Sequence, residues 1–157
     1  AVNEAGFQLN NKTVAVLGLA FKKHTNDMRD ASSIKVVEGL LGRGVAQIRA
    51  YDPLANDTAR KVFDPSRNIL FEKVAYFDTT KAAIEGSDAL FISSDCEEFR
   101  GLSRTVEETV RPPYLIIDGR RMIPDFEDLT SRGYTYMAVG SMVISPTESV
   151  DTARQAV

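Results

Sequence analysis

Short apolar runs and helical patterns of apolar residues alternate along this chain. Runs rich in Val, Ile and Leu predict six strands. Between them, apolar residues recur three or four positions apart and predict helices, and Gly or Pro follows most of these segments. The predicted strands are 13–17, 46–51, 74–77, 89–93, 115–118 and 134–139, and the predicted helices are 33–42, 56–63, 80–84, 97–110 (interrupted near Gly101) and 125–131.

Strands that alternate with helices indicate βαβ units and a mostly parallel sheet. Right-handed crossovers then place helices on both faces of that sheet. The expected fold class is therefore α/β, a Rossmann-like three-layer α/β/α sandwich. A length of 157 residues suits one domain, 1–157, with its core at about 12–140. The polar tail 145–157 is expected to be poorly ordered or to form a short helix.

The connection after the first predicted strand is unusually long. Most strand-to-helix connections take roughly 2–6 residues, whereas this one takes about a dozen and carries Lys22, Lys23 and Arg29. Open α/β sheets bind ligands outside the carboxyl ends of their strands. A long cationic loop at that place predicts a site for an anionic ligand.

Composition excludes several classes of function. The net charge is −3, and no clustered basic face of the kind that binds nucleic acid is evident. Every apolar run is far shorter than the ~20 residues of a membrane helix, so neither nucleic acid nor membrane is an expected partner. The first residues lack the features of a signal peptide. A single cysteine permits no disulfide within the chain, which fits a reducing, cytoplasmic setting.

Two segments resemble a known family. Gly18–Lys22 (Gly-Leu-Ala-Phe-Lys) and then Thr25–Arg29 (Thr-Asn-Asp-Met-Arg) resemble the signature that opens the C-terminal domain of the UDP-glucose/GDP-mannose dehydrogenases. Ile117–Arg121 (Ile-Asp-Gly-Arg-Arg) stands where that domain carries an arginine that binds the sugar nucleotide. The resemblance covers roughly residues 12–140. It implies NAD-dependent oxidation of the C6 hydroxyl of a nucleotide sugar to a carboxylate.

The resemblance also implies roles for single residues. Phe21, Lys22 and Arg120 would contact the sugar nucleotide, and Arg29 would reach the pyrophosphate of NAD. Charge-assisted hydrogen bonds suit all three cations to phosphate. The residues alone also allow interpretations without a ligand. Lys22 would then be a solvated lysine, Arg29 the partner of Asp27 or Asp30, and Arg120 a surface arginine after a turn.

The implied whole enzyme is larger than this chain. The match is to a C-terminal domain, most like that of the UDP-glucose 6-dehydrogenases, which convert UDP-glucose to UDP-glucuronate in two hydride transfers to NAD. The family's nucleophilic cysteine and main NAD site would lie in a missing N-terminal dinucleotide-binding domain, so this chain would hold no catalytic residue. Family members are typically homo-oligomers. UDP-N-acetylhexosamine or GDP-mannose as substrate stays open, as does a non-enzymatic nucleotide-binding regulatory module or a dimerisation domain.

Other reactive side chains fit structural roles better. Acidic neighbours of Cys96 would raise the pKa of its thiol, which opposes a nucleophilic role. His24 is the only histidine, so no metal-ligand spacing exists. Asp52 precedes a proline and is expected in a turn rather than on a ribose, since the Gly-x-Gly-x-x-Gly loop of dinucleotide sites is missing. The chain departs mildly from the family at Asn26, where an acid is usual, and at 30–32, where Asp-Ala-Ser replaces Glu-Ser-Pro.

Overall fold

A seven-stranded sheet forms the centre of the molecule. The computed structural model describes residues 7–139 and 143–144. The strand order is β3-β2-β1-β4-β5-β6-β7, in which the first six are parallel and β7 is antiparallel to β6. The strands are β1 (Thr13–Leu17), β2 (Gln47–Tyr51), β3 (Val74–Tyr76), β4 (Ala89–Ile92), β5 (Leu115–Asp118), β6 (Thr135–Ala138) and β7 (Val143–Ile144).

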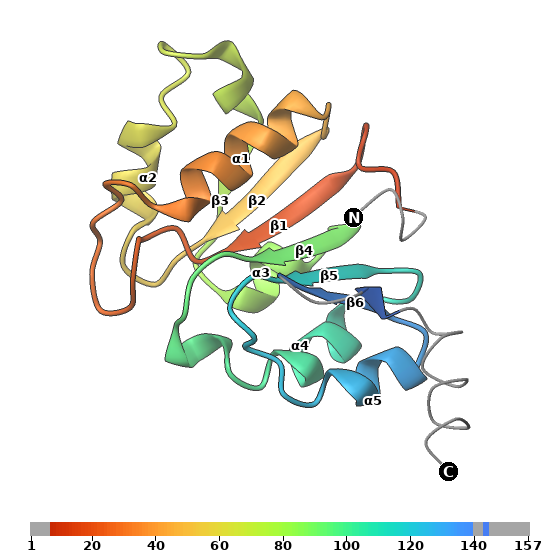
Figure 1. Cartoon of the computed structure of the whole chain (residues 1–157). Helices are drawn as coiled ribbons and strands as arrows, with labels where there is room; N and C mark the ends of the chain where they lie inside the picture. The colour runs from red at the N-terminus through yellow and green to blue at the C-terminus, as the bar shows by residue number, and fades with distance from the viewer. Residues whose placement is uncertain (1–6, 140–142, 145–157) are drawn as a thin grey trace.

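Helices cover both faces of the sheet (Figure 1). On one face lie α1 and α2, and on the other α3, α4 and α5. Their bounds are α1 (Ser32–Gly42), α2 (Asn56–Val62), α3 (Thr80–Ile84), α4 (Leu102–Thr109) and α5 (Phe126–Ser131), with 3-10 turns η1 (Ile69–Lys73) and η2 (Glu97–Phe99). The three-layer α/β/α sandwich predicted from the sequence is confirmed.

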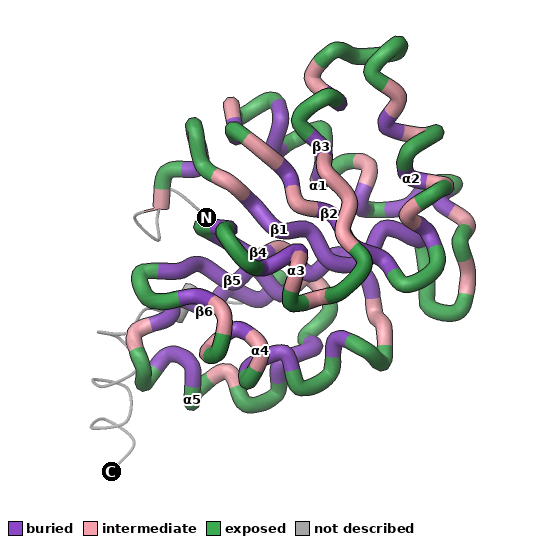
Figure 2. Tube along the Cα trace, turned by 180° about the vertical axis from the view of Figure 1, so that it is seen from behind, coloured by how far each residue is buried: buried purple, intermediate pink, exposed green. Residues whose placement is uncertain are grey.

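The two cores follow from the period of two along each strand. In β1, Val14 and Val16 pack toward α1 and α2, whereas Ala15 and Leu17 face the opposite layer. All four are buried, because a parallel sheet covered on both faces needs apolar residues at every position. Figure 2 shows the result as a buried sheet with exposed segments on the surrounding helices and loops.

The predicted elements are confirmed with two exceptions. Residues 134–139 were expected to hold the last strand, but β7 follows β6 and pairs with it. The turn η1 was not predicted, because Ile69–Lys73 shows no helical period. The tail 145–157 lies outside the described residues, and the single-domain extent of 1–157 stays a prediction. Within the described part, no helix has both the length and the apolar character needed to cross a membrane.

The chain reverses direction across the sheet between β1 and β4. After β1 it builds β2 and β3 on one side, and then it crosses to β4 on the other. The carboxyl ends of β1 and β4 therefore flank the topological switch point, where open α/β sheets leave a crevice for ligands. The loops 18–31, 93–96 and 119–125 all start at this edge of the sheet.

Candidate functional site

The long loop after β1 is closed on itself. The Phe21 amide donates to the Asp27 carbonyl at 2.9 Å, which brings the two limbs of the loop together. Phe21 is 39% exposed, and the Lys22 Nζ lies 5.1 Å from the centroid of its ring, within cation–π range. Lys22 is exposed. The predicted contact residues Phe21 and Lys22 therefore form one accessible apolar and cationic surface.

A buried carboxylate fixes the start of this loop. Asp52, directly after β2, accepts hydrogen bonds from the backbone amides of Leu19 and Ala20 at 2.8 and 3.1 Å. Its other oxygen accepts from Leu54 and Ala55 at 2.8 and 3.0 Å. Since four backbone donors occupy the carboxylate, it is engaged in the turn and not presented to a ribose. The interpretation of Asp52 as a turn residue is confirmed.

Arg29 forms an ion pair with Asp27 and is also exposed to solvent. Its Nε lies 3.1 Å from both Asp27 oxygens, and its Nη2 donates to Oδ2 at 2.7 Å. These hydrogen bonds lower the pKa of Asp27 from 3.8 to about 2. The Arg29 side chain is 89% exposed. Among the residues that the structure describes, no hydrogen bond engages its Nη1, so that edge can meet a phosphate while Asp27 holds the other.

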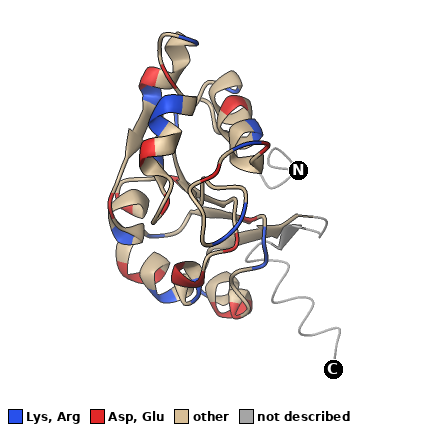
Figure 3. Cartoon of the chain, turned by 90° about the vertical axis from the view of Figure 1, so that its left-hand side faces the viewer, with Lys and Arg blue, Asp and Glu red and all other residues tan. Residues whose placement is uncertain are grey.

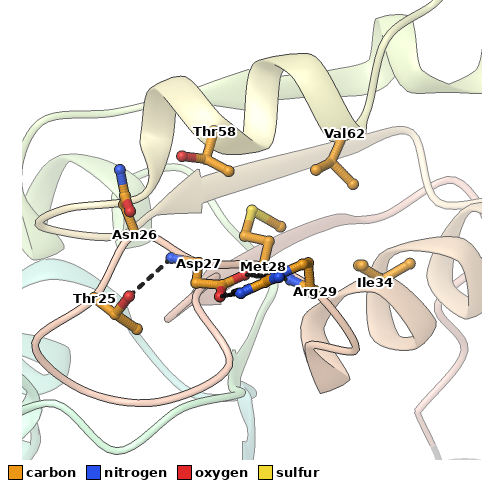
Figure 4. A pocket seen from close by; sticks show the side chains of 8 residues that line it. All are labelled: Thr25, Asn26, Asp27, Met28, Arg29, Ile34, Thr58 and Val62. Atoms are coloured by element: carbon orange, nitrogen blue, oxygen red, sulfur yellow. Dashed lines mark hydrogen bonds and ion pairs between the residues drawn. The ribbon is translucent and has the colours of Figure 1, made fainter.

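A cavity of about 560 Å³ adjoins this ion pair (Figure 4). Polar and apolar side chains of the loop and of the helices α1 and α2 line it together. The lining residues are Thr25, Asn26, Asp27, Met28, Arg29, Ile34, Thr58 and Val62. The loop thus packs near α1 and α2 and leaves this cavity between them. Met28, a loop residue that lines the cavity, is buried.

Arg120 lies on a different loop but at the same edge of the sheet. Its Nε donates to the Ser93 carbonyl, which follows β4, at 3.3 Å. The Ser32 hydroxyl, at the start of α1, donates to the same carbonyl at 3.2 Å. The start of α1, the end of β4 and the loop after β5 are thereby linked through Ser93. Arg120 is exposed, so its guanidinium lies at the switch point and is accessible from solvent.

One residue of this site was missed in the sequence. The sequence shows Asp118 only as the last residue of a buried strand. In the structure, its carboxylate accepts hydrogen bonds from the loop that carries Arg120. The Arg120 and Met122 amides donate to Oδ1 at 3.2 and 2.9 Å. The Ile123 amide and the Tyr136 hydroxyl donate to Oδ2 at 3.0 and 2.8 Å. The sequence feature that could have indicated this role is an acidic residue at the end of an otherwise apolar strand.

Cys96 has a raised pKa, and His24 lies near the acidic side chain of Glu97. Cys96 is half-buried, and its pKa is raised, first by burial and then by acidic neighbours that include Glu98. A thiol held in its protonated form is a poor nucleophile. His24 is exposed, with Nε2 3.9 Å from Glu97 Oε1. Within the described part of the chain, no group of three or more metal-ligating side chains occurs.

Charge on the surface is mixed rather than gathered. In Figure 3, Lys and Arg alternate with Asp and Glu over the helices. No continuous basic face covers the elements in that view. Arg120 at the switch point thus contributes a local positive charge, suited to a small anion.

The chain is similar to known proteins in sequence and in fold. Residues 15–125 match the model of the UDP binding domain of the UDP-glucose/GDP-mannose dehydrogenase family. The chain is 34% identical over 143 residues to UDP-glucose 6-dehydrogenase TuaD of Bacillus subtilis, covering 91% of this chain and 29% of that protein. It is 35% identical over 123 residues to UDP-glucose 6-dehydrogenase AglM of Haloferax volcanii, covering 78% and 26%.

Solved structures give the same picture. A UDP-D-ManNAc dehydrogenase from Pyrococcus horikoshii superposes with a TM-score of 0.62 at 26% identity, covering 88% of this chain and 28% of that one. A UDP-glucose dehydrogenase from Pyrobaculum islandicum gives 0.61 at 26% identity, covering 77% and 24%. The chain thus spans less than a third of the length of these relatives.

Proposed function

Since the chain belongs to the UDP-glucose/GDP-mannose dehydrogenase family as its C-terminal UDP-binding domain, we propose that it binds the UDP-sugar substrate of an NAD-dependent UDP-glucose 6-dehydrogenase. The whole enzyme would oxidise UDP-glucose to UDP-glucuronate in two hydride transfers to NAD. The names of its relatives TuaD and AglM favour UDP-glucose over GDP-mannose or a UDP-N-acetylhexosamine. We place that enzyme in the cytoplasm, as a homo-oligomer.

The observation that carries this proposal is the arginine at the switch point. Arg120 is tied to the Ser93 carbonyl by its Nε, while the rest of its guanidinium remains accessible from solvent. A diphosphate offers the charge and the oxygen acceptors that a fixed guanidinium recognises. The flexible ammonium of Lys22 would add a second positive charge. The exposed Phe21 ring would contact an apolar part of the nucleotide.

This chain would contribute only part of the binding site for NAD. NAD, when bound, accepts the hydrides. The acidic residue after β2, Asp52, is occupied by four backbone amides and leaves no carboxylate for a ribose. Arg29 keeps an edge of its guanidinium that no described residue engages, and this edge would contact the cofactor pyrophosphate. We therefore propose that an N-terminal dinucleotide-binding domain of the same enzyme holds NAD and supplies the nucleophilic cysteine, and that this chain holds no catalytic residue.

Two-dimensional NMR titration of this chain with UDP, GDP and NAD⁺, each separately, tests the proposal. We expect UDP to shift the amides of Phe21, Lys22 and Arg120, with GDP shifting them less. Lys22→Ala and Arg120→Ala should each weaken UDP binding by about tenfold, the value of one charge-assisted hydrogen bond. Lys12→Ala is the matched control, because Lys12 is an exposed lysine before the opposite end of β1.

Arg43→Ala is the control for arginine, since Arg43 is exposed and follows α1 at the far end of that helix. Neither control should change the affinity for UDP. UDP shifts confined to other parts of the chain, or an unchanged affinity in Arg120→Ala, would contradict the proposed site. Equal binding of UDP and GDP would favour the regulatory nucleotide-binding module over a UDP-sugar dehydrogenase domain.

A further inference from the structure

The Asp118 carboxylate is fully enclosed and accepts four hydrogen bonds. Three come from backbone amides of the turn that follows it, those of Arg120, Met122 and Ile123, at 2.9–3.2 Å. The fourth comes from the Tyr136 hydroxyl on the neighbouring strand β6, at 2.8 Å. Asp118 is 0% exposed, so no water competes for these oxygens. All four partners are donors, as an ionised carboxylate requires.

The turn benefits from such an anchor because one of its residues, Arg121, has an unfavourable backbone conformation. Gly119 approaches the Ile92 carbonyl so closely that a Cβ would lie 2.7 Å from that oxygen. Two residues later, Arg121 has a φ of 54°, in the left-handed region that side chains disfavour. A residue in that region stays there only where the surroundings hold it. The three hydrogen bonds from backbone amides to the Asp118 carboxylate supply that constraint.

Arg120 is consequently fixed at two points. Its backbone amide is held by Asp118, and its side-chain Nε is held by the Ser93 carbonyl at the end of β4. If the hydrogen bond from the Arg120 amide to Asp118 were lost, the turn could relax and the guanidinium could leave the switch point. Binding by a preordered arginine avoids the entropy cost of ordering it on contact with the ligand.

We propose that Asp118 is a positioning residue, which acts through Arg120 to hold the guanidinium where the diphosphate of a nucleotide sugar binds. The proposal rests on the function proposed above. It assigns to Asp118 no contact with the ligand. Its effect on affinity should therefore exist only while Arg120 is present.

A double-mutant cycle on this chain tests that dependence. Asp118→Asn places an amide where acceptors are needed, so at least one backbone N–H of the turn loses its partner. We expect Asp118→Asn to weaken UDP binding by about threefold to tenfold, and Arg120→Ala by about tenfold. Adding Asp118→Asn to Arg120→Ala should cause no further loss of affinity.

Tyr136→Phe is the matched control. It removes one hydrogen bond to the same carboxylate and leaves the three hydrogen bonds from the backbone amides of the turn in place. The ring can still stack on Phe126, which it meets at a centroid distance of 4.5 Å. It should lower the midpoint of urea unfolding without changing the affinity for UDP. Equal losses of affinity in Tyr136→Phe and Asp118→Asn would reduce Asp118 to a general structural role and overturn the proposal.

Two ligand-free measurements separate this proposal from the proposed function. In the unaltered chain, the Met122 and Ile123 amides should exchange with solvent at least about tenfold more slowly than unprotected amides. In Asp118→Asn, the Arg120 Nε–H resonance should shift and exchange faster. Unprotected amides in the unaltered chain would overturn the proposal even if Asp118→Asn failed to fold.

Additive losses of affinity in the cycle would also overturn the positioning role. If the ligand-free results hold but Arg120→Ala leaves the affinity for UDP unchanged, then Asp118 positions Arg120 as inferred. In that case, the assignment of Arg120 to the nucleotide sugar is what fails.

Discussion

The pair of Asp27 and Arg29 shows how one charged contact organises a whole loop. Asp27 accepts from the Arg29 amide, Nε and Nη2, while its own carbonyl accepts from Phe21. The pKa of Asp27 falls to about 2, mainly because Arg29 donates to the carboxylate, with a minor contribution from the charge of Lys22. Carbon-detected NMR should therefore find the Asp27 titration midpoint near pH 2.

Two variants separate the causes of this shift. Arg29→Ala should return the midpoint of Asp27 toward the ordinary value of about 3.9, whereas Lys22→Ala should move it much less. Because the folded pKa lies below the unfolded one, the stabilisation by Asp27 is complete above about pH 4 and is lost as the pH falls through about 2. The stability difference between the unaltered chain and Asp27→Asn should shrink over that interval. A difference that stays constant from pH 5 to pH 2 would contradict it.

At the scale of elements, α1 carries a residue that weakens it without serving the site. Gly39 lies in the helix interior, is exposed, and a Cβ there would meet nothing within 4 Å. Gly39→Ala should raise the free energy of unfolding by about 1 kcal/mol, because alanine restricts the unfolded chain and favours the helix. Urea unfolding followed by circular dichroism measures this gain.

Gly86→Ala is the opposite case. Here too a Cβ would meet open space, but φ is +78°, a conformation that glycine tolerates and alanine does not. This substitution should destabilise the fold by about 1 kcal/mol. The two variants add the same methyl group, so their opposite signs would isolate the backbone conformation as the cause. Destabilisation by Gly39→Ala would show instead that α1 packs against something at that position.

For the molecule as a whole, the sequence predicts what depends on local pattern. The parallel strands show as apolar runs, and the long cationic loop is visible because it replaces a short turn. The two-residue strand β7 carries no period and depends on pairing with β6. The role of Asp118 depends on a turn that folds back and on Tyr136 from the next strand. Such long-range contacts leave no local pattern, so both were missed.

The entire chain carries a single cysteine. It is expected to bind UDP but to reduce no NAD⁺ with UDP-glucose, because its only cysteine, Cys96, has a raised pKa and remains a thiol at neutral pH. Iodoacetamide should label Cys96 slowly at pH 7 and faster as the pH rises above 9, and unfolding in urea should remove this protection. Cys96→Ser should bind UDP like the unaltered chain. Fast labelling at neutral pH, or NAD⁺ reduction that Cys96→Ser abolishes, would instead make this thiol a reactive group.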